Sequence, residues 1–520
     1  MAVSIFNDVV GPVMRGPSSS HCAAALRIGR LALDLMEGEI NEVLVEFDVH
    51  GSLPTTHASQ GSDMGLFGGL LGWDATDERL PQSKRHLEEQ GVRIRIETIN
   101  VKDPHPNTYR LTLRNSRAEH RLIAISTGGG MMQVISIDGC SVLIEGGYFE
   151  MLLLGVSDPA KLAATLDGRV PFDEIVEGKG PECAFLILRS AQLIPKERIA
   201  AVSDEIALSD MRILKPVLPV PSVKDLTVPF LTCDELLRYD GGRQRALWEH
   251  AIDYECARGN LSREAVWDLM QTIVGIARDS IAKGIEGTDY QDRILGHQSG
   301  GFRSKMKEGS LLDGGMLNTM VLYVTALMEM KSSMGVIIAA PTAGACAGFP
   351  GGTLGAADFL QKTDDDCIKA MLAGGLIGLF IAHRSTFAAE VSGCQAEGGA
   401  SSGMTAAALA TLGGASLDQT LAASSMALQN CLGMICDPVA NRVEAPCLGR
   451  NVIAASNALS CANMAMAGFD PVIPLDEVIA TMDDVGKSLP RELRCTGLGG
   501  LSVTATSKAI ERRLCRSCSC

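Results

Sequence analysis

Three cysteine-centred segments read Ser392-Gly-Cys-Gln-Ala-Glu-Gly-Gly399, Met434-Ile-Cys-Asp-Pro-Val439 and Glu444-Ala-Pro-Cys-Leu-Gly-Arg-Asn451. Their thiols belong to Cys394, Cys436 and Cys447. A closed structural zinc site uses four ligands, often in paired C-x-x-C segments, whereas three cysteines can hold a [4Fe–4S] cluster and leave one iron free. Burial as small apolar residues is the alternative, since free cysteines are common in protein cores. The spacing alone leaves both interpretations open.

The sequence around these cysteines predicts a mostly α-helical domain over residues 228–520. Several stretches show helical periodicity or are rich in alanine, and they are separated by Gly and Pro. They are Leu236–Val274, Leu317–Lys331, Ile368–Ile381, Met404–Leu412, Leu417–Leu428 and Val452–Met466. No strand alternation is evident there. The three cysteines therefore lie next to predicted helix ends, where loops can bring distant thiols together.

The N-terminal part has a different pattern and predicts an α/β sandwich over residues 1–150. Ala23–Leu35 has helical spacing, whereas Val43–Val49 and Val92–Ile96 alternate like strands. Residues 151–227 predict a small αβ module and a linker, with an ACT-like ligand-binding domain as one possibility. The fold class expected for the whole chain is α+β.

Composition narrows the function classes. The 520-residue chain carries a net charge of −15 and no basic stripe, which argues against a nucleic-acid partner. The longest apolar run, Ala370–Ala382, is too short to span a bilayer, so no membrane partner is expected. The first residues do not read as a secretory signal. We therefore expect a cytoplasmic protein in which the 16 cysteines do not form disulfides.

The words around the cysteines resemble a known family. G-C-Q-A-E-G-G, C-D-P-V-A, V-E-A-P-C and the upstream Ala339-Ala-Pro-Thr-Ala-Gly-Ala-Cys346 are similar to the α region of the iron–sulfur L-serine dehydratases. The N-terminal third separately resembles the β region of the same enzymes. The resemblance implies a [4Fe–4S] cluster on Cys394, Cys436 and Cys447, no pyridoxal phosphate, and a substrate-binding role for Thr342.

In the N-terminal part, Gly16-Pro-Ser-Ser-Ser-His21 precedes the first predicted helix. Free amides and the helix dipole make such a turn suitable for a carboxylate, although a plain N-cap is the simpler interpretation. The resemblance favours substrate binding. It assigns the following residues: Ser18, Ser19, Ser20 and Asp63 to substrate binding, and His21 and His105 to the polar groups of catalysis.

Two departures from the family pattern stand near these residues. Relatives usually read T-G-K-G-H-G-T-D where this chain reads Thr56-His-Ala-Ser-Gln-Gly-Ser-Asp63, so the family's functional histidine falls on Gln60. Glutamine can hydrogen-bond but cannot act as a general base near neutral pH, and His57 could replace it only if the loop is rearranged. Cys495 stands where relatives usually have R-E-T. One of the tail cysteines Cys515, Cys518 and Cys520 could reach the open iron, or the tail could have no ligand role.

The resemblance implies a lyase of amino acid catabolism and gluconeogenesis that converts L-serine to pyruvate and ammonia by β-elimination of water. Two alternatives stay open. A related lyase could act on a threonine-like or cysteine-like substrate, and a catalytically silent homologue could bind a metal or sense a ligand. The expected partner is a small amino acid, and the expected assembly is a homo-oligomer such as a dimer. The resemblance leaves the base for the α-proton unassigned.

Overall fold

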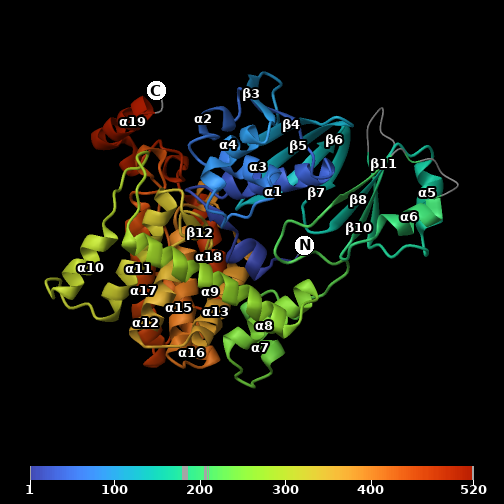
Figure 1. The fold of residues 1–520 in the computed structure, drawn as a ribbon. Helices are drawn as coiled ribbons and strands as arrows, with labels where there is room; N and C mark the ends of the chain where they lie inside the picture. The colour runs from blue at the N-terminus through green and yellow to red at the C-terminus, as the bar shows by residue number, and fades with distance from the viewer. Residues whose placement is uncertain (1, 179–184, 204–207, 209, 518–520) are drawn as a thin grey trace. The chain divides into compact units, whose positions relative to one another are not determined.

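The computed structural model describes residues 2–178, 185–203, 208 and 210–517, and the chain divides into two compact units (Figure 1). Unit 1 comprises Met1–Pro17 and Thr227–Cys520, and unit 2 comprises Ser18–Leu226. Unit 2 contains two β-sheets with helices, and unit 1 is mostly helical. The α+β class expected from the sequence is confirmed.

The larger sheet of unit 2 has six strands in the order β3-β2-β4-β5-β6-β7. The strands are β2 (Glu42–Asp48), β3 (Arg93–Ile99), β4 (Thr108–Arg114), β5 (Glu119–Gly128), β6 (Met131–Ile137) and β7 (Cys140–Ile144). Only β2 and β3 pair in parallel among them. Strands β2, β5 and β6 alternate buried and more exposed residues, and the buried face of the sheet forms one apolar core with the helices.

Four helices accompany this sheet: α1 (Cys22–Leu35), α2 (Leu53–Thr56), α3 (Ser62–Leu70) and α4 (Ser83–Glu89). Glycines let α1 and α3 pack with their backbones in contact. A Cβ atom on Gly65 would lie 2.1 Å from the carbonyl oxygen of Cys22, and one on Gly69 would lie 2.2 Å from that of Leu26. No larger residue fits at these positions. The contact fixes the start of α1 beside the start of α3.

The smaller sheet of unit 2 has the strand order β11-β8-β10-β9. Its elements are β8 (Phe149–Leu154), α5 (Pro159–Leu166), β9 (Glu174–Glu177), β10 (Leu186–Ser190), α6 (Lys196–Ser203) and β11 (Asp210–Leu214). This is the β-α-β-β-α-β sequence of a ferredoxin-like motif. Helices α5 and α6 lie on one face of the sheet (Figure 1), and a separate apolar cluster fills the space between them.

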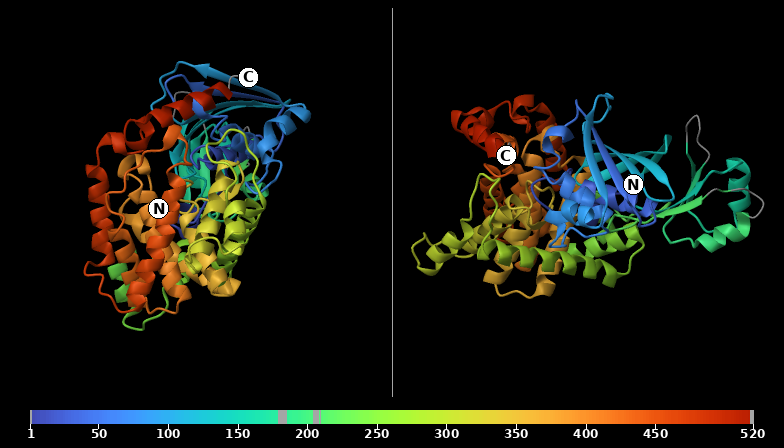
Figure 2. Two further views of the ribbon diagram at one scale, coloured as in Figure 1. Left: turned by 90° about the vertical axis from the view of Figure 1, so that its left-hand side faces the viewer. Right: turned by 45° about the horizontal axis from the view of Figure 1, so that its top comes forward.

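Unit 1 is built from helices that pack side by side. They are α7 (Cys233–Asp240), α8 (Leu247–Gly259), α9 (Arg263–Glu286), α10 (Ser299–Lys307), α11 (Met316–Ser332), α12 (Gly348–Phe359), α13 (Asp364–Arg384), α14 (Ala389–Ser392), α15 (Ala400–Leu412), α16 (Leu417–Gln429), α17 (Cys447–Met466), α18 (Leu475–Ser488) and α19 (Ala505–Ser517). Helix α15 is almost wholly buried and contacts α12, α13, α16 and α17. Its small residues allow this close packing. Figure 2 shows the yellow-to-red helices of unit 1 lying side by side.

The N-terminal residues pack within unit 1. Ile5–Val9 forms a π-helical turn against α13, and β1 (Val13–Arg15) pairs antiparallel with β12 (Val336–Ile338). Strand β12 is an exception to the absence of strands expected in this region. It is only three residues long, so too short for alternation to be visible in the sequence.

The stretch Leu236–Val274, expected to be helical, contains three helices in the structure, α7, α8 and α9. Helix α7 ends at Gly241 and α8 ends at Asn260, both in the left-handed conformation that commonly ends helices. The thirteen residues of α8 show weak sidedness because they are buried on several faces. The helical periodicity of the sequence continues across the ends of α7 and α8. The residues that show where these helices end are Gly241 and Asn260.

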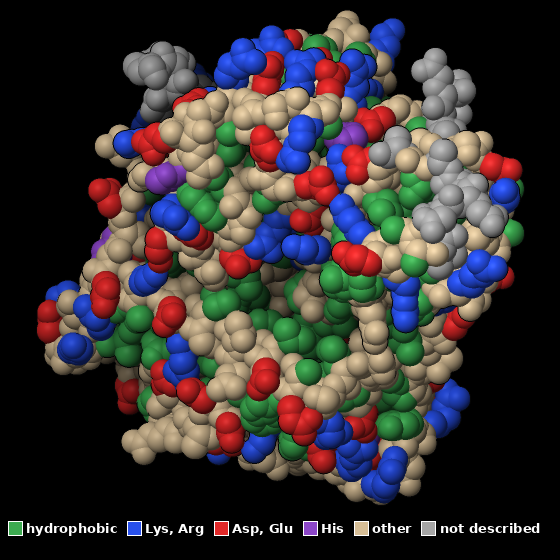
Figure 3. Space-filling model, turned by 45° about the vertical axis from the view of Figure 1, so that its right-hand side comes forward, with side chains coloured by type: hydrophobic (Ala, Val, Ile, Leu, Met, Phe, Trp, Pro, Cys, Tyr) green, Lys and Arg blue, Asp and Glu red, His purple; other side chains and the backbone are tan. Residues whose placement is uncertain are grey.

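Helix α13 is long and apolar enough, by length and composition alone, to cross a membrane, and 78% of its most apolar window is buried inside the protein. It serves as a core helix of unit 1. On the face shown in Figure 3, Lys and Arg side chains are interspersed with Asp and Glu.

Cys140 is disulfide-bonded, which corrects the expectation that the chain has no disulfides. Oxidation depends on a suitably placed second thiol, which the sequence did not reveal.

Candidate functional site

The thiols of Cys394 and Cys436 meet in unit 1. Together with a carboxylate oxygen of Glu397, their ligand atoms all lie within 4.8 Å of one another. Cys394 directly precedes a π-helical turn, Gln395–Gly399, and such turns occur frequently at functional sites. Cys436 follows α16. Two segments that are far apart in the sequence therefore converge on one buried group of ligand atoms.

Gln395 fixes these two segments relative to each other. Its amide donates to the carbonyl of Met434 over 3.1 Å, and its side-chain Oε1 accepts from the amide of Gly433 over 2.8 Å. Its Nε2 donates to the carbonyl of Met482 over 2.7 Å. The side chain of Gln395 is fully buried, so its hydrogen bonds are shielded from water on that side. The Cys394 and Cys436 loops are thus held rigidly.

Cys447 is the first residue of α17 and is buried. Burial raises the pKa of its thiol, the charges of Cys394 and Glu397 raise it further, and the charges of Lys331 and Arg450 oppose this. Asn451, one turn later, accepts the amides of Ala347 and Gly348 on Oδ1 and donates to the carbonyl of Gly344. Cys447 therefore lies within electrostatic reach of Cys394, and its helix is tied to the 340–347 loop.

Thr342, in that loop, donates a hydrogen bond of 2.6 Å to Oε1 of Glu397. Burial of the carboxyl raises the pKa of Glu397 to about 7, while the bond from Thr342 lowers it. Gly344 makes this approach possible, since a Cβ atom there would lie 2.8 Å from Oε1 of Glu397. The predicted residue Thr342 is thus beside the thiol group, linked to it through Glu397.

Two cations balance the potential thiolates. Arg450 donates from Nη1 to the sulfur of Cys394 over 3.2 Å and also pairs with Asp437. Lys331 is fully buried on α11, donates to the carbonyl of Val443, and interacts electrostatically with Cys447 and Glu397. Buried cations stabilise the ionised form of nearby thiols, which is the form that binds metals.

This donor set fits an iron–sulfur cluster. Soft thiolate ligands favour iron–sulfur clusters, zinc or copper over hard cations. Cys394 and Cys436 converge, Cys447 lies within electrostatic reach of Cys394, and buried positive charge offsets the negative charge of the thiolates. The three cysteines come from loops or helix ends, as the sequence predicted, and not from separate apolar interiors.

In unit 2, the serine-rich turn leads directly into α1. Ser18 Oγ lies 2.8 Å from Nδ1 of His21, and Nε2 of His21 lies 3.0 Å from Oγ1 of Thr56. The N-cap residue of α1 is His21, and it makes no side-chain cap. Ser18 therefore bonds to the histidine and not to the helix amides. Ser19 is buried and Ser20 is partly exposed.

Burial lowers the pKa of His21 to about 4, so its imidazole is neutral near pH 7. A neutral imidazole donates from one nitrogen and accepts on the other. The hydroxyls of Ser18 and Thr56 lie on both sides of the ring. These two contacts fix the orientation of the His21 ring between Ser18 and Thr56.

The loop after β2 holds a second histidine. Nδ1 of His57 lies 2.7 Å and 2.9 Å from the two carboxylate oxygens of Asp63, which is in the first turn of α3. Gly61 (φ +91) joins the loop to the helix in a conformation that glycine adopts without strain. Gln60 is partly exposed, and only its backbone amide has a hydrogen bond recorded among the described residues. His57, not Gln60, is the residue that Asp63 orients.

His105 belongs to the same region of unit 2. Its Nδ1 accepts the amide of Asn107 over 3.1 Å, and its carbonyl accepts the hydroxyl of Thr108 over 2.7 Å. Asn107 pairs with Ser52, whose carbonyl also accepts Thr56 Oγ1 over 2.7 Å. A continuous set of hydrogen bonds thus connects the His105 loop with the loop that contains His57.

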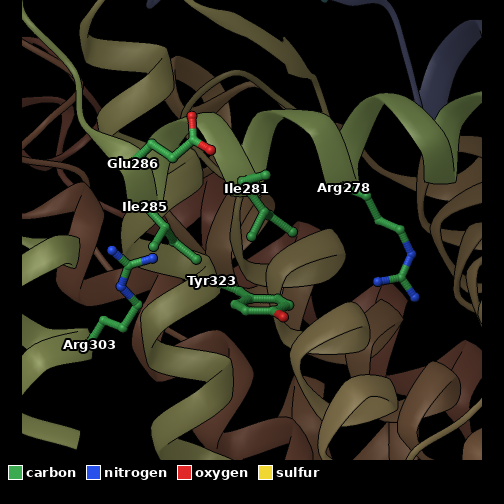
Figure 4. A pocket seen from close by; sticks show the side chains of 7 residues that line it. Arg278, Ile281, Ile285, Glu286, Arg303 and Tyr323 are labelled. Carbon is green, nitrogen blue, oxygen red and sulfur yellow. The ribbon is translucent and has the colours of Figure 1, made fainter. Parts of the chain in front are cut away.

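A separate cavity of about 340 Å³ lies among α9, α10 and α11 in unit 1. Its lining includes Arg278, Ile281, Ile285, Arg303 and Tyr323 (Figure 4). None of the cysteines lines this cavity. Arg278 is paired with Asp358 and Asp364, so the charge of one of the two arginines in the cavity lining is already neutralised. The cavity is distinct from the thiol group.

Comparison with known proteins identifies the family. Residues 242–502, half of the chain, match the family model described as serine dehydratase alpha chain. This chain belongs to the L-serine dehydratase family. It is 33% identical over 285 residues to a probable L-serine dehydratase alpha chain of Bacillus subtilis, covering 55% of this chain and 95% of that protein. The family resemblance expected from the sequence is confirmed.

Two further relatives also carry L-serine dehydratase names. A probable L-serine dehydratase beta chain of Bacillus subtilis is 36% identical over 151 residues, covering 29% of this chain and 67% of that protein. An L-serine dehydratase of Streptomyces coelicolor is 26% identical over 523 residues and covers 97% of this chain and 99% of that protein. The Streptomyces coelicolor protein therefore matches nearly the whole of this chain.

Sequence reasoning missed several residues of this L-serine dehydratase family member. Gln395, Glu397 and Arg450 lie inside the quoted cysteine segments but were given no roles. Lys331 ends an otherwise apolar helical stretch. A lysine at that position was the sequence signal for a buried positive charge. The suggested contacts of the tail cysteines cannot be compared, since Cys518 and Cys520 and the side chain of Cys515 lie outside the described residues.

Proposed function

We propose that this protein converts L-serine to pyruvate and ammonia by β-elimination of water, using a [4Fe–4S] cluster held by Cys394, Cys436 and Cys447. The observation that carries the proposal is the convergence of the Cys394 and Cys436 thiols, with buried Cys447 in electrostatic reach. Relatives named L-serine dehydratase support the substrate. When bound, the cluster supplies a Lewis-acidic iron for the departing hydroxyl.

The surrounding residues of unit 1 prepare this chemistry. The charges of Arg450 and Lys331 favour the ionised thiols, against the effect of burial, and Gln395 holds two of the cysteine loops in place. Glu397, bonded to Thr342, can hold a proton near neutral pH beside the Cys394 sulfur. We assign Thr342 to orienting this carboxyl and a polar group of the substrate.

Residues of unit 2 take the other proposed roles. Ser18, Ser19 and Ser20 precede α1 and supply hydroxyls and amides suited to a carboxylate. His21, neutral and fixed between two hydroxyls, orients the turn. His105 and Gln60 serve as polar groups, and Asp63 acts through His57. Loss of the α-proton and of hydroxide gives 2-aminoacrylate, which tautomerises to an imine and hydrolyses to pyruvate and ammonia.

The deciding experiment is an anaerobic assay of the purified, iron-reconstituted protein for 2-oxo acid and ammonia. Serine, threonine and cysteine are supplied in parallel. We expect the wild-type protein to turn over serine. The Cys436→Ala variant should lose both this activity and the brown chromophore. Colourless wild-type protein with full turnover would refute the cluster.

The same assay separates the alternative substrates. Gln60 and Cys495 depart from the family pattern, which favours testing threonine and cysteine as substrates. Faster turnover of either one would assign a related lyase. Protein that carries iron and sulfide but turns over none of the three would be the silent homologue. Cys461→Ala is the control, because Cys461 is buried on α17 beside Asn430 and Asn457, away from Cys394.

A further inference from the structure

Cys495 lies beside Cys436 because backbone hydrogen bonds join their segments. The amide of Cys436 donates to the carbonyl of Leu493 over 2.8 Å, and the amide of Cys495 donates to the carbonyl of Cys436 over 2.8 Å. The two bonds flank Arg494 and form a short parallel bridge. The closeness of the two cysteines is therefore fixed by the backbone.

The side chain of Cys495 joins the same thiol group. It packs in the small cluster formed by Ala389, Cys394 and Cys436, and its thiol hydrogen-bonds that of Cys436. The other three cysteines are buried, whereas Cys495 is partly exposed. Four sulfurs thus belong to one locality of unit 1, and Cys495 is at its accessible side.

The backbone conformation of Cys495 is unusual, and neighbouring hydrogen bonds hold it in place. Its φ of +58° lies in the left-handed region, which non-glycine residues adopt rarely and at a cost that the surrounding structure must offset. Here the following loop is anchored, because the amide of Leu501 donates to Asp437 over 2.8 Å. A cysteine held in a strained conformation beside the thiols of Cys436 and Cys394 points to a function for its sulfur.

We propose that Cys495 is the fourth cysteine ligand of the cluster. The proposal rests on the cluster assigned under the proposed function. Four cysteines complete the coordination of a [4Fe–4S] cluster, so Cys495 fills the position that Cys394, Cys436 and Cys447 leave open. Because Cys495 alone of the four is partly exposed, it would be the cluster ligand that solvent and substrate can reach. The free enzyme then holds its cluster with four thiolates.

Mössbauer spectra of anaerobic, isotopically enriched protein test this assignment. In the wild type, the four irons are expected to have closely similar environments. In Cys495→Ala and Cys495→Ser, about one quarter of the iron is expected in a distinct environment, because one iron of four loses its thiolate. Ferricyanide oxidation should then give a three-iron signal in electron paramagnetic resonance spectra of the Ala variant. Cys256→Ala, a partly exposed thiol on α8, should match the wild type.

The outcomes separate this ligand from the cluster itself. A wild-type spectrum that already has a distinct iron and is unchanged in both variants overturns the role of Cys495 and leaves the cluster in place. Wild-type protein without iron and sulfide overturns the cluster, and the fourth ligand with it. The wild-type spectrum alone decides the question if the variants do not fold, since a distinct iron in it contradicts four cysteine ligands.

Discussion

Oγ1 of Thr342 lies 2.6 Å from Oε1 of Glu397, and Oε2 of the same carboxyl lies 3.8 Å from the sulfur of Cys394. A loop hydroxyl is thus connected to a proposed cluster ligand through a single carboxyl. Removing the hydroxyl leaves Glu397 without this donor in a desolvated setting. Losing a hydrogen bond to such a group costs about 1.5–3 kcal/mol.

Thr342→Val, which keeps the side-chain shape, should therefore lower kcat/KM for serine by about tenfold to a hundredfold. Iron and sulfide content should be unchanged, because Thr342 is not a proposed ligand. Thr342→Ser keeps the hydroxyl and is the matched control. Equal kcat/KM in the Val variant and the wild type would show that the hydroxyl does not contribute.

His57 should be needed for removal of the α-proton, because Asp63 fixes its Nδ1 and leaves Nε2 without a recorded partner among the described residues. A positioned general base contributes about a hundredfold or more. His57→Gln should lower kcat by that amount and slow deuterium exchange at the α-carbon of serine in heavy water. His50→Gln, an exposed histidine in the same loop, is the control. Unchanged exchange in His57→Gln would exclude this role.

Local patterns predicted the helical region well, and they failed where long-range contacts decide. The helix ends next to Cys394, Cys436 and Cys447 follow from Gly and Pro in the sequence. The pairing of β1 with β12 joins residues more than three hundred positions apart, and nothing local specifies it. Such contacts depend on tertiary packing, which a single sequence does not encode in its periodicity.

The candidate site shows the same division. The cysteines could be chosen from motif resemblance, whereas the contact of Cys495 with Cys436 depends on a backbone bridge that no spacing indicates. His57 was considered only as a rearranged substitute for Gln60. The structure shows that α3 already brings Asp63 to His57, because Gly61 turns the chain there. Which side chains pair across a turn depends on the backbone geometry, and the residue types alone do not determine it.

Arg450 should control how firmly the cluster is held. Its guanidinium donates to the sulfur of Cys394 over 3.2 Å and pairs with Asp437. Arg450→Met removes a charge-assisted hydrogen bond worth about 1.5–3 kcal/mol, so iron should pass to a chelator at least about tenfold faster. The measurement is loss of cluster absorbance over time under anaerobic conditions. Arg245→Met, which breaks an ion pair with Asp253, should leave the rate unchanged.

Glu255 should make the stability of unit 1 depend on pH. It is fully buried, accepts the amide of Ile5 over 2.6 Å and the hydroxyl of Ser4 over 3.0 Å, and burial raises its pKa from 4.5 to about 7. The folded protein therefore binds a proton more tightly than the unfolded chain does. The resulting stabilisation is complete below pH 4.5 and is lost as the pH rises to about 7.

A shift of this size corresponds to about 3 kcal/mol of unfolding free energy. Glu255→Gln keeps the shape and one acceptor oxygen but cannot ionise, so it lacks this loss. The difference in unfolding free energy between the wild type and Glu255→Gln, from urea titrations, should therefore move by about 3 kcal/mol in favour of the variant between about pH 4.5 and pH 8. Subtracting the variant cancels other titrating groups, including Glu150, whose pKa burial also raises to about 7. A difference that stays constant over this range would show that folding does not raise the pKa of Glu255, because the amide of Ile5 and the hydroxyl of Ser4 offset its burial.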